Sequence, residues 1–277
     1  MLIATREQEL ASPLKTRWRQ LTARIEVLGS AVVAFSGGVD SSLLAAAAWS
    51  ALADRMLAVT FVSPIEVEND LEAAKMLAVE LGFAHRLVEV DDLSDPDFTA
   101  NPPQRCFMCK LKRFKQMLTI AKSEGFACLI EGSNADDLQE YRPGRKAALQ
   151  CGVFSPLQEL GFTKIEIRQL AKALMLPNWD KPSSPCLATR FPYYTRLTHN
   201  GLQMVSDAEE YLTGLGFSQV RVRFHDPIAR IEVKPEEIER MTVKYAQVAV
   251  KLKSLGFQYV TLDLQGFRSG SLDEELS

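Results

Sequence analysis

The chain has 277 residues, of which 47% are hydrophobic and 24% are charged, and its formal net charge at pH 7 is -3. This length suffices for two domains with separate cores, and the composition is that of a soluble globular protein. No apolar run is long enough to span a bilayer, the first residues lack a signal-peptide pattern, and the basic excess of a strong nucleic-acid binder is missing. We therefore expect a cytoplasmic protein that acts on small molecules rather than on a membrane or a nucleic acid.

Strand-like and helix-like segments alternate through the first half of the chain. Apolar runs predict strands at residues 31–35, 55–61, 85–90 and 126–130. Periodicity and capping signals, including a Ser63–Glu66 capping box, predict helices at residues 6–28, 42–53, 63–81 and 108–123. This alternation predicts an α/β fold with a doubly wound parallel sheet, in which ligands bind at the carboxyl ends of the strands.

The pattern changes in the second half. A capping box formed by Thr163 and Glu166 predicts a helix that ends near Pro177, and a Pro- and Ser-rich stretch follows. Further signals predict helices at 201–214 and 236–254 and strands at 219–224, 229–233 and 258–263. We expect a nucleotide-binding domain at 1–160 and a smaller α+β domain at 161–277, with a frayed tail from Ser269.

The most informative segment connects the first predicted strand to the following helix. It reads Ser36-Gly37-Gly38-Val39-Asp40-Ser41-Ser42. The glycines let the backbone approach a ligand closely, the helix N-terminus favours an anion, and the serines add hydroxyl donors. The segment therefore predicts a phosphate-binding loop, with an ordinary Gly turn as the alternative. It is not the common phosphate loop, which has Lys followed by Ser or Thr after its last glycine.

A second polar segment, residues 131–137, directly follows the fourth predicted strand and so lies at the same sheet edge. Its Gly, Asn and Asp residues are suited to holding ribose, pyrophosphate or Mg²⁺, although a solvated turn would use the same residue types. Gly132, Asn134 and Asp137 are the nucleotide-contacting candidates of this segment. Thr60 and Ser63, at the end of the second predicted strand, are further candidates for contact with adenosine.

Five cysteines in a chain without export signals predict thiols, metal ligands or nucleophiles rather than disulfides. Cys106 and Cys109 have the Cys-x-x-Cys spacing of metal ligands and lie where a loop is expected to run into a helix. Cys186 lies in a Pro-rich loop, where a nearby Arg190 would favour the nucleophilic thiolate. We interpret two cysteines as structural: Cys128 and Cys151.

Several of these segments together resemble the LarE family of PP-loop ATP pyrophosphatases. They are the SGGxDS loop, the Pro-Ser-Ser-Pro-Cys-Leu-Ala-Thr-Arg segment at 182–190, and the Val-Arg-Val-Arg-Phe-His and Ala-Arg-Ile-Glu-Val segments at 220–225 and 229–233. The resemblance implies an adenine nucleotide alpha hydrolase-like fold and an ATP-dependent sulfur transferase. Such an enzyme adenylylates a carboxylate of pyridinium-3,5-biscarboxylic acid mononucleotide and converts it to a thiocarboxylate, releasing AMP and pyrophosphate during nickel-pincer nucleotide synthesis for lactate racemase.

The resemblance also implies residue roles. We expect ATP and Mg²⁺ to bind at the phosphate loop, with Asp40 helping to place the metal or to orient the loop, and the resemblance implies homo-oligomers, including hexamers. The sulfur comes either from Cys186 itself, which becomes dehydroalanine, or from a 4Fe-4S cluster held by Cys106, Cys109 and Cys186. Zinc is the alternative metal. The substrate's phosphate and carboxylates suit a set of arginines, although those of the strand would also fit a solvated face. This set is Arg190, Arg221, Arg223 and Arg230.

Three other functions fit parts of the sequence. An ammonia-dependent adenylating synthetase such as NAD synthetase shares the phosphate loop but needs no cysteine. A tRNA thiolation enzyme shares both the loop and a three-cysteine cluster, and its mark is strong, salt-sensitive RNA binding. A non-catalytic adenine-nucleotide sensor would bind nucleotide without releasing pyrophosphate.

Overall fold

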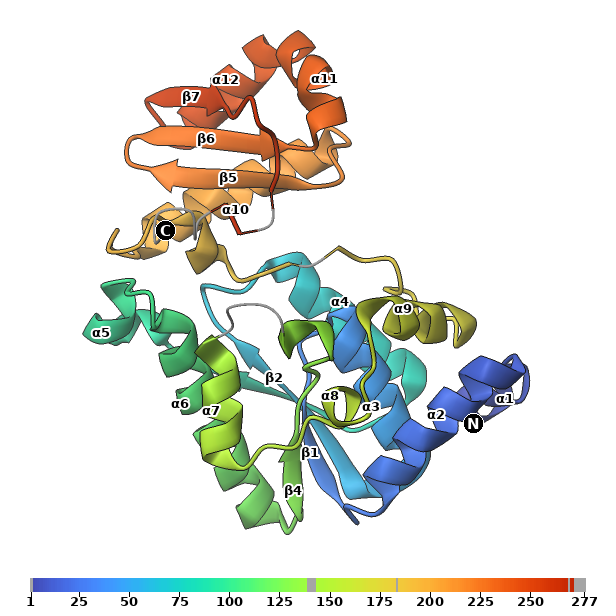
Figure 1. The fold of residues 1–277 in the computed structure, drawn as a ribbon. Coiled ribbons are helices and arrows are strands. Elements are labelled where there is room, and N and C mark those ends of the chain that lie inside the picture. The colour runs from blue at the N-terminus through green and yellow to red at the C-terminus, as the bar shows by residue number, and fades with distance from the viewer. Residues whose placement is uncertain (1, 139–142, 183, 269, 272–277) are drawn as a thin grey trace. The chain divides into compact units, whose positions relative to one another are not determined.

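The computed structural model describes residues 2–138, 143–182, 184–268 and 270–271 (Figure 1). The chain divides into two compact units. Unit 1 comprises residues 1–63, 68–90 and 104–184, and unit 2 comprises residues 64–67, 91–103 and 185–277. The chain passes between the units several times, the last time at Ser184/Pro185, and residue 160, where the domain boundary is expected, lies within unit 1.

Unit 1 contains alternating strands and helices. Its strands are β1 (Ala31–Ala34), β2 (Met56–Val62), β3 (His85–Glu89) and β4 (Cys128–Ile130). Its helices are α1 (Leu2–Gln8), α2 (Ser12–Glu26), α3 (Val39–Leu52), α4 (Glu68–Leu81), α6 (Arg105–Glu124), α7 (Pro143–Cys151), α8 (Pro156–Glu159) and α9 (Lys164–Ala173).

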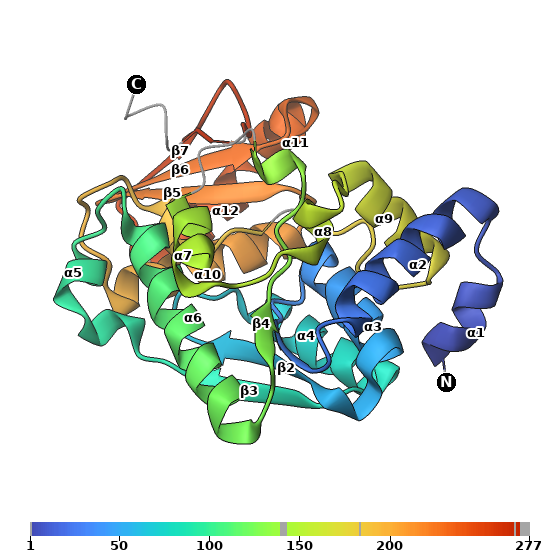
Figure 2. The same cartoon turned by 60° about the horizontal axis from the view of Figure 1, so that its bottom comes forward.

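The described strands of unit 1 form a parallel sheet in the order β3-β2-β1-β4. On β1, Ala31 and Val33 face a core shared with α2, α3, α4 and α9, whereas Val32 faces the core shared with α6 and α7. Helices therefore cover both faces of the sheet, as both views show (Figure 2). The doubly wound α/β fold predicted from the alternating pattern is confirmed.

Two helix predictions in unit 1 differ from the structure. The Ser63–Glu66 capping box does not start a helix, because residues 64–67 belong to unit 2, where the Ile65 carbonyl accepts a hydrogen bond from the Leu187 amide at 2.7 Å. This tertiary contact overrides the local signal. The single helix expected at 6–28 is divided into α1 and α2, and Pro13 lies in the first turn of α2, where proline is tolerated.

Unit 2 is a smaller α+β unit. Its elements are α5 (Pro96–Thr99), α10 (His199–Gly214), β5 (Val220–His225), β6 (Ile228–Val233), α11 (Ile238–Val243), α12 (Tyr245–Ser254) and β7 (Tyr259–Leu262). The described strands form a mixed sheet in which β5 and β6 pair antiparallel and β6 and β7 pair parallel. The helix expected at 236–254 is divided at Lys244 into α11 and α12.

The core of unit 2 contains an aromatic group. The Phe224 ring on β5 stacks on Phe191 with centroids 4.7 Å apart and lies 5.9 Å from the Phe257 ring. Because side chains alternate along a strand, Arg221 and Arg223 point to the opposite face of the sheet from Phe224. No helix within the described residues combines the length and apolar character needed to cross a membrane.

Candidate active site

The phosphate loop of unit 1 connects β1 to α3 and has a fixed backbone conformation. Gly37 has a φ of +72°, and a Cβ at this position would lie 2.9 Å from both the Ala74 Cβ and the Asp70 carbonyl oxygen of α4. Glycine is therefore required here both for its conformation and for its close approach to a neighbouring helix. The loop leads directly into α3, whose first amide groups have no intrahelical acceptor.

Serine hydroxyls hold the loop in shape. The Ser41 Oγ donates to the Gly38 carbonyl at 3.0 Å and accepts from the Ser36 amide at 3.2 Å. The Ser36 Oγ lies 3.1 Å from the Ser41 Oγ and accepts from the Gly38 amide at 3.4 Å. The loop is therefore organised before any anion binds, as electrostatic preorganisation requires.

Asn178 is a second support of the loop, and no motif in the sequence points to it. Its Nδ2 donates to the Gly37 carbonyl and to the Ser42 Oγ, both at 2.8 Å. Among the described residues its buried Oδ1 has no hydrogen-bond partner. Asn178 lies 141 positions from Gly37 in a Pro- and Ser-rich stretch without periodicity, so only the folded chain brings the two together.

Asp40 of the loop forms an ion pair that the sequence did not indicate. The Lys164 Nζ lies 2.5 Å from the Asp40 Oδ2, while the Asp40 Oδ1 is buried and has no hydrogen-bond partner among the described residues. Lys164 is the first residue of α9, whose predicted capping box of Thr163 and Glu166 is confirmed. Its amide also donates to the Asp136 Oδ2 at 2.8 Å.

The segment after β4 lies against the phosphate loop. A Cβ on Gly132 would lie 3.1 Å from the Ser41 amide nitrogen, so glycine allows the two backbones to approach. The buried Asn134 accepts through Oδ1 from the amides of Asp136 and Asp137, and its own amide donates to the Asp137 Oδ2 at 3.0 Å. These bonds shape the segment, and contact of Asn134 and Asp137 with nucleotide stays a prediction.

Thr60 at the carboxyl end of β2 is buried and bonded within the protein. Its hydroxyl contacts the Phe35 carbonyl at 2.5 Å and the His85 Nε2 at 2.8 Å. A carbonyl only accepts, so Thr60 donates to Phe35 and the His85 Nε2 carries the proton. Thr60 therefore fixes the end of β1 next to the phosphate loop. Ser63 follows β2 directly, and its contact with adenosine stays a prediction.

The two cysteines of the Cys-x-x-Cys pair lie inside α6 rather than in a loop before it. The helix begins at Arg105, so Cys106 and Cys109 occupy its first two turns. Residues three apart lie on the same helix face, and Cys106 is exposed whereas Cys109 is half-buried. Cys128 is buried in β4 as predicted, and burial raises the pKa of its thiol.

Cys186 immediately precedes a short 3₁₀ helix, Leu187–Arg190, in unit 2. The Cys186 carbonyl accepts from the Thr189 amide at 3.0 Å, the Thr189 hydroxyl at 2.8 Å and the Arg190 guanidinium at 3.2 Å. Arg190 is 1% exposed and pairs through two hydrogen bonds with Glu209. It thus holds the turn that carries the half-buried Cys186, and binding of a substrate anion by Arg190 stays a prediction.

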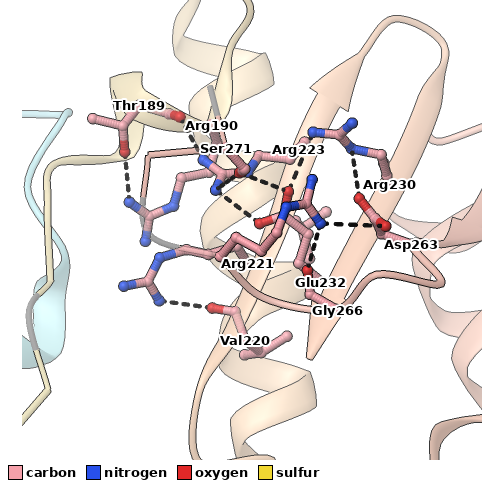
Figure 3. Close-up of polar contacts among 12 residues, drawn as sticks. Thr189, Arg190, Val220, Arg221, Arg223, Arg230, Glu232, Asp263, Gly266 and Ser271 are labelled. Atoms are coloured by element: carbon pink, nitrogen blue, oxygen red, sulfur yellow. Dashed lines mark hydrogen bonds and ion pairs between the residues drawn. The ribbon is translucent and has the colours of Figure 1, made fainter. Parts of the chain in front are cut away.

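The predicted arginines of β5 and β6 are brought together on one face of the sheet (Figure 3). Arg223 donates to Glu232 and to the Ser271 hydroxyl, both at 2.8 Å, and Glu232 is fully buried. Arg230 donates to Glu232 at 3.2 Å and is 32% exposed. The alternative of a solvated face is wrong for Arg221 and Arg223, which are both buried.

One arginine on this face, Arg221, has a lowered pKa. Burial, together with the neighbouring Arg190 guanidinium, lowers the pKa of Arg221 to about 10. Arg221 remains charged at neutral pH, donates to the Val220 carbonyl at 2.7 Å and lies over the Phe267 ring. Ser271, expected in a frayed tail, is instead buried on this face, whereas residues 269 and 272–277 lie outside the described residues.

Comparison with known proteins identifies the family. An uncharacterized protein of Synechocystis sp. is 42% identical over 95% of this chain and 99% of its own length. The pyridinium-3,5-bisthiocarboxylic acid mononucleotide synthase of Lactiplantibacillus plantarum is 41% identical over 95% of this chain and 96% of its own. The chain belongs to the LarE family.

Partial matches place this LarE protein in a wider group. A family model described as NAD synthase matches residues 16–105, which include the phosphate loop. A tRNA-specific 2-thiouridylase of Rickettsia typhi is 30% identical, but over 57% of this chain and 54% of its own length. The LarE protein is an ATP-dependent adenylating enzyme of the PP-loop class.

The metal ligands predicted for this LarE protein are divided between the two units. Cys106 and Cys109 belong to unit 1 and Cys186 belongs to unit 2. Within the part of the chain that the structure describes, no group of three or more His, Cys, Asp or Glu side chains is placed to hold a metal ion. The three-cysteine ligand set therefore stays a prediction.

Proposed function

We propose that this LarE protein transfers sulfur to pyridinium-3,5-biscarboxylic acid mononucleotide during synthesis of the nickel-pincer nucleotide. The observation that carries the proposal is the full-length similarity to the synthase of Lactiplantibacillus plantarum, whose name gives a bisthiocarboxylic acid mononucleotide as product. Sulfur must replace oxygen on a carboxylate, and a carboxylate oxygen is a poor leaving group until it is adenylylated.

The first step joins a substrate carboxylate oxygen to the α-phosphorus of ATP. The bond to the β-phosphate breaks, and pyrophosphate leaves. The preorganised loop of Ser36, Gly37, Gly38, Ser41 and Ser42 supports this step, because amide and hydroxyl donors stabilise phosphate charge. Mg²⁺ would be held at Asp40, whose buried Oδ1 has no hydrogen-bond partner among the described residues and suits a hard cation. Gly132, Asn134, Asp137, Thr60 and Ser63 are proposed to surround the nucleotide.

The second step attaches sulfur to the activated carbon, and AMP leaves. With Cys186 as the donor, its thiolate forms a thioester with the substrate. Loss of the Cys186 Cα proton and cleavage of its Cβ–sulfur bond then release the thiocarboxylate and leave dehydroalanine. The half-buried position of Cys186 in a turn held by Arg190 supports this role.

A cluster is the second possible sulfur source, since this chain also carries Cys106 and Cys109. Their soft thiol ligands and helical spacing suit an iron–sulfur cluster, with Cys186 as third ligand. When bound, a 4Fe-4S cluster with an open iron would supply a replaceable sulfide. Zinc would instead require a fourth ligand to close a structural site.

The arginine face of unit 2 is proposed to receive the anionic groups of the substrate. Arg230 is the most exposed of its guanidiniums, and Arg221 and Arg223 add buried positive charge behind it. Forked guanidiniums match phosphate and carboxylate groups. In this assignment unit 1 activates ATP and unit 2 presents the substrate and Cys186.

We also propose that the protein is a homo-oligomer, up to a hexamer, as the family resemblance implies. Several large apolar side chains of unit 2 are exposed, including Val243, Tyr245 and Tyr259. Light scattering after size exclusion tests this proposal, and a monomer at micromolar concentration would contradict it.

Mass spectrometry of protein and product after turnover tests the sulfur chemistry. The purified protein is given ATP, Mg²⁺ and pyridinium-3,5-biscarboxylic acid mononucleotide, before and after anaerobic reconstitution with iron and sulfide. Sulfur in the product together with dehydroalanine at Cys186 supports the sacrificial donor. Sulfur with intact Cys186, lost in Cys106→Ala and Cys109→Ala, supports the cluster. Cys151→Ala is the matched control, and pyrophosphate release with no sulfur in the product would reject both.

A further inference from the structure

The phosphate loop of this protein lacks a lysine of its own. In the common phosphate loop a lysine follows the last glycine and reaches the terminal phosphates of the nucleotide. Here Val39 and Asp40 follow Gly38, so the loop contributes a carboxylate where the common loop contributes a cation. A triphosphate placed in this loop needs positive charge from another element, apart from the metal ion.

We propose that Lys164 supplies that charge by leaving Asp40 and binding the β- and γ-phosphates of ATP and the departing pyrophosphate. Its Nζ already lies 2.5 Å from the Asp40 Oδ2, within the loop that cradles the phosphates. The proposal concerns ATP binding alone, so it does not depend on which acceptor or sulfur donor the enzyme uses.

The backbone of Lys164 is fixed at the meeting point of the two nucleotide segments. Its amide donates to Asp136 of the segment after β4, and the preceding capping box of Thr163 and Glu166 fixes the start of α9. The side chain remains the mobile part, with four rotatable bonds and 30% exposure. A short movement of the ammonium group therefore suffices to exchange one anionic partner for another.

The energetics favour the exchange. Asp40 and Lys164 are 24% and 30% exposed, and ion pairs of such exposure contribute about 0–1 kcal/mol to stability. The phosphates of ATP carry more negative charge than the Asp40 carboxylate, so we expect a lysine–phosphate contact to be the stronger of the two. Departure of Lys164 also leaves both carboxylate oxygens of Asp40 available for Mg²⁺.

Other lysines of unit 1 are less suited to this role. Lys181 pairs with Asp70 at 2.8 Å, and Lys172 lies over the Trp179 ring at the far end of α9. Lys110 is the nearest rival, because its Nζ lies 3.7 Å from Glu131, directly before Gly132. Lys110 contacts the second segment but no residue of the phosphate loop in the described interactions.

Calorimetric titration with ATP, pyrophosphate and AMP, each with Mg²⁺, tests the proposal. Lys164→Ala should weaken ATP and pyrophosphate binding by about ten- to a hundredfold, because a hydrogen bond to a charged group is lost. AMP affinity should change by less than about twofold, which also verifies that the variant is folded. Lys164→Arg should retain part of the affinity, and Lys172→Ala, on the same helix and with the same loss of charge, should bind all three ligands normally.

A double variant separates phosphate binding from simple neutralisation of Asp40. If Lys164 serves only to compensate Asp40, then adding Asp40→Asn to Lys164→Ala should restore pyrophosphate affinity to that of Asp40→Asn alone. In our proposal the double variant stays at least about tenfold weaker than Asp40→Asn. Restoration, an equal loss of AMP affinity, or normal pyrophosphate binding by Lys164→Ala would each overturn the proposal. The same loss in Lys110→Ala with none in Lys164→Ala would assign the role to Lys110.

Discussion

The phosphate loop of unit 1 and the arginine face of unit 2 are both suited to anions, but they are built differently. The loop uses glycine, amide and hydroxyl groups, and its Asp40–Lys164 ion pair is partly exposed. The arginine face uses buried side-chain charges that are balanced internally, with Glu232 at 0% exposure between Arg223 and Arg230.

Because of this difference, we expect substitutions in the loop to affect mainly ligand binding and substitutions in the arginine face to affect mainly the free energy of unfolding. Backbone donors cost little to keep unoccupied, because each is neutral and held by secondary structure. Buried charges must be compensated in the folded protein, since an uncompensated charge in the interior is costly. The loop is therefore expected to tolerate loss of its ion pair and to lose function, whereas the arginine face is expected to lose stability first.

The largest predicted effect is on the stability of unit 2. Glu232→Ala leaves buried Arg223 without its carboxylate and should lower the free energy of unfolding by about 3–5 kcal/mol. Asp40→Ala in unit 1 should lower it by less than about 1 kcal/mol. Urea unfolding followed by circular dichroism measures both variants.

Tryptophan fluorescence supplies an internal control for that experiment. Trp18, Trp49 and Trp179 all lie in unit 1, so their fluorescence reports that unit. Glu232→Ala should shift the circular dichroism transition more than the fluorescence transition. Equal destabilisation by Glu232→Ala and Asp40→Ala would remove the distinction between the two regions.

The second prediction tests the loop geometry with a pair of glycines. Gly37→Ala places a Cβ 2.9 Å from the Ala74 Cβ, whereas Gly29→Ala, at a similar φ of +78°, meets no atom within 4 Å. Both variants carry backbone strain of about 1–2 kcal/mol. Only Gly37→Ala should displace the loop, and a displacement of about 1 Å can reduce the rate of pyrophosphate release about a hundredfold.

Steady-state pyrophosphate release and urea unfolding of the two glycine variants are measured together. Gly29→Ala should lose stability and keep its rate, which controls for strain alone. A normal rate in Gly37→Ala would show that the close approach to α4 does not position the loop.

The sequence was sufficient where the signals are local. The apolar strand, the two glycines and the helix that follows them are adjacent in the chain, so this strand–loop–helix arrangement could be predicted. The capping box of Thr163 and Glu166 was correct for the same reason. The equally local box at Ser63 was wrong, because the Ile65 carbonyl instead accepts a hydrogen bond from the Leu187 amide, far along the chain.

Contacts between distant residues account for what the sequence could not predict. Lys164 and Asp40 are separated by 124 positions, and neither residue carries a pattern that points to the other. The alternating Arg and Val residues of β5 suggested one solvated face, since alternation is typical of half-buried strands. Glu232 and Ser271 cover that face instead, and their pairing with Arg223 depends on the register of the folded sheet and on the return of the chain near its end.

The smallest predicted effect concerns the pH dependence of unit 1. Burial, and then the nearby charge of Lys75, lower the pKa of His85, so the folded state favours the neutral ring. Below the ordinary pKa of about 6.5 the unfolded chain binds more protons, and stability should fall as the pH falls from there toward the lowered folded-state pKa. His85→Gln, which can still donate to Thr60, should remove this component below about pH 6.5 while leaving the carboxylate titration unchanged. Tryptophan fluorescence in urea, measured at each pH for both proteins, reports the unfolding of unit 1, because Trp18, Trp49 and Trp179 lie there. The difference between the two free energies of unfolding at each pH is then the contribution of His85. Parallel pH profiles would show that protonation of His85 is not coupled to folding, and a steeper loss in the variant would reverse the sign derived from its burial.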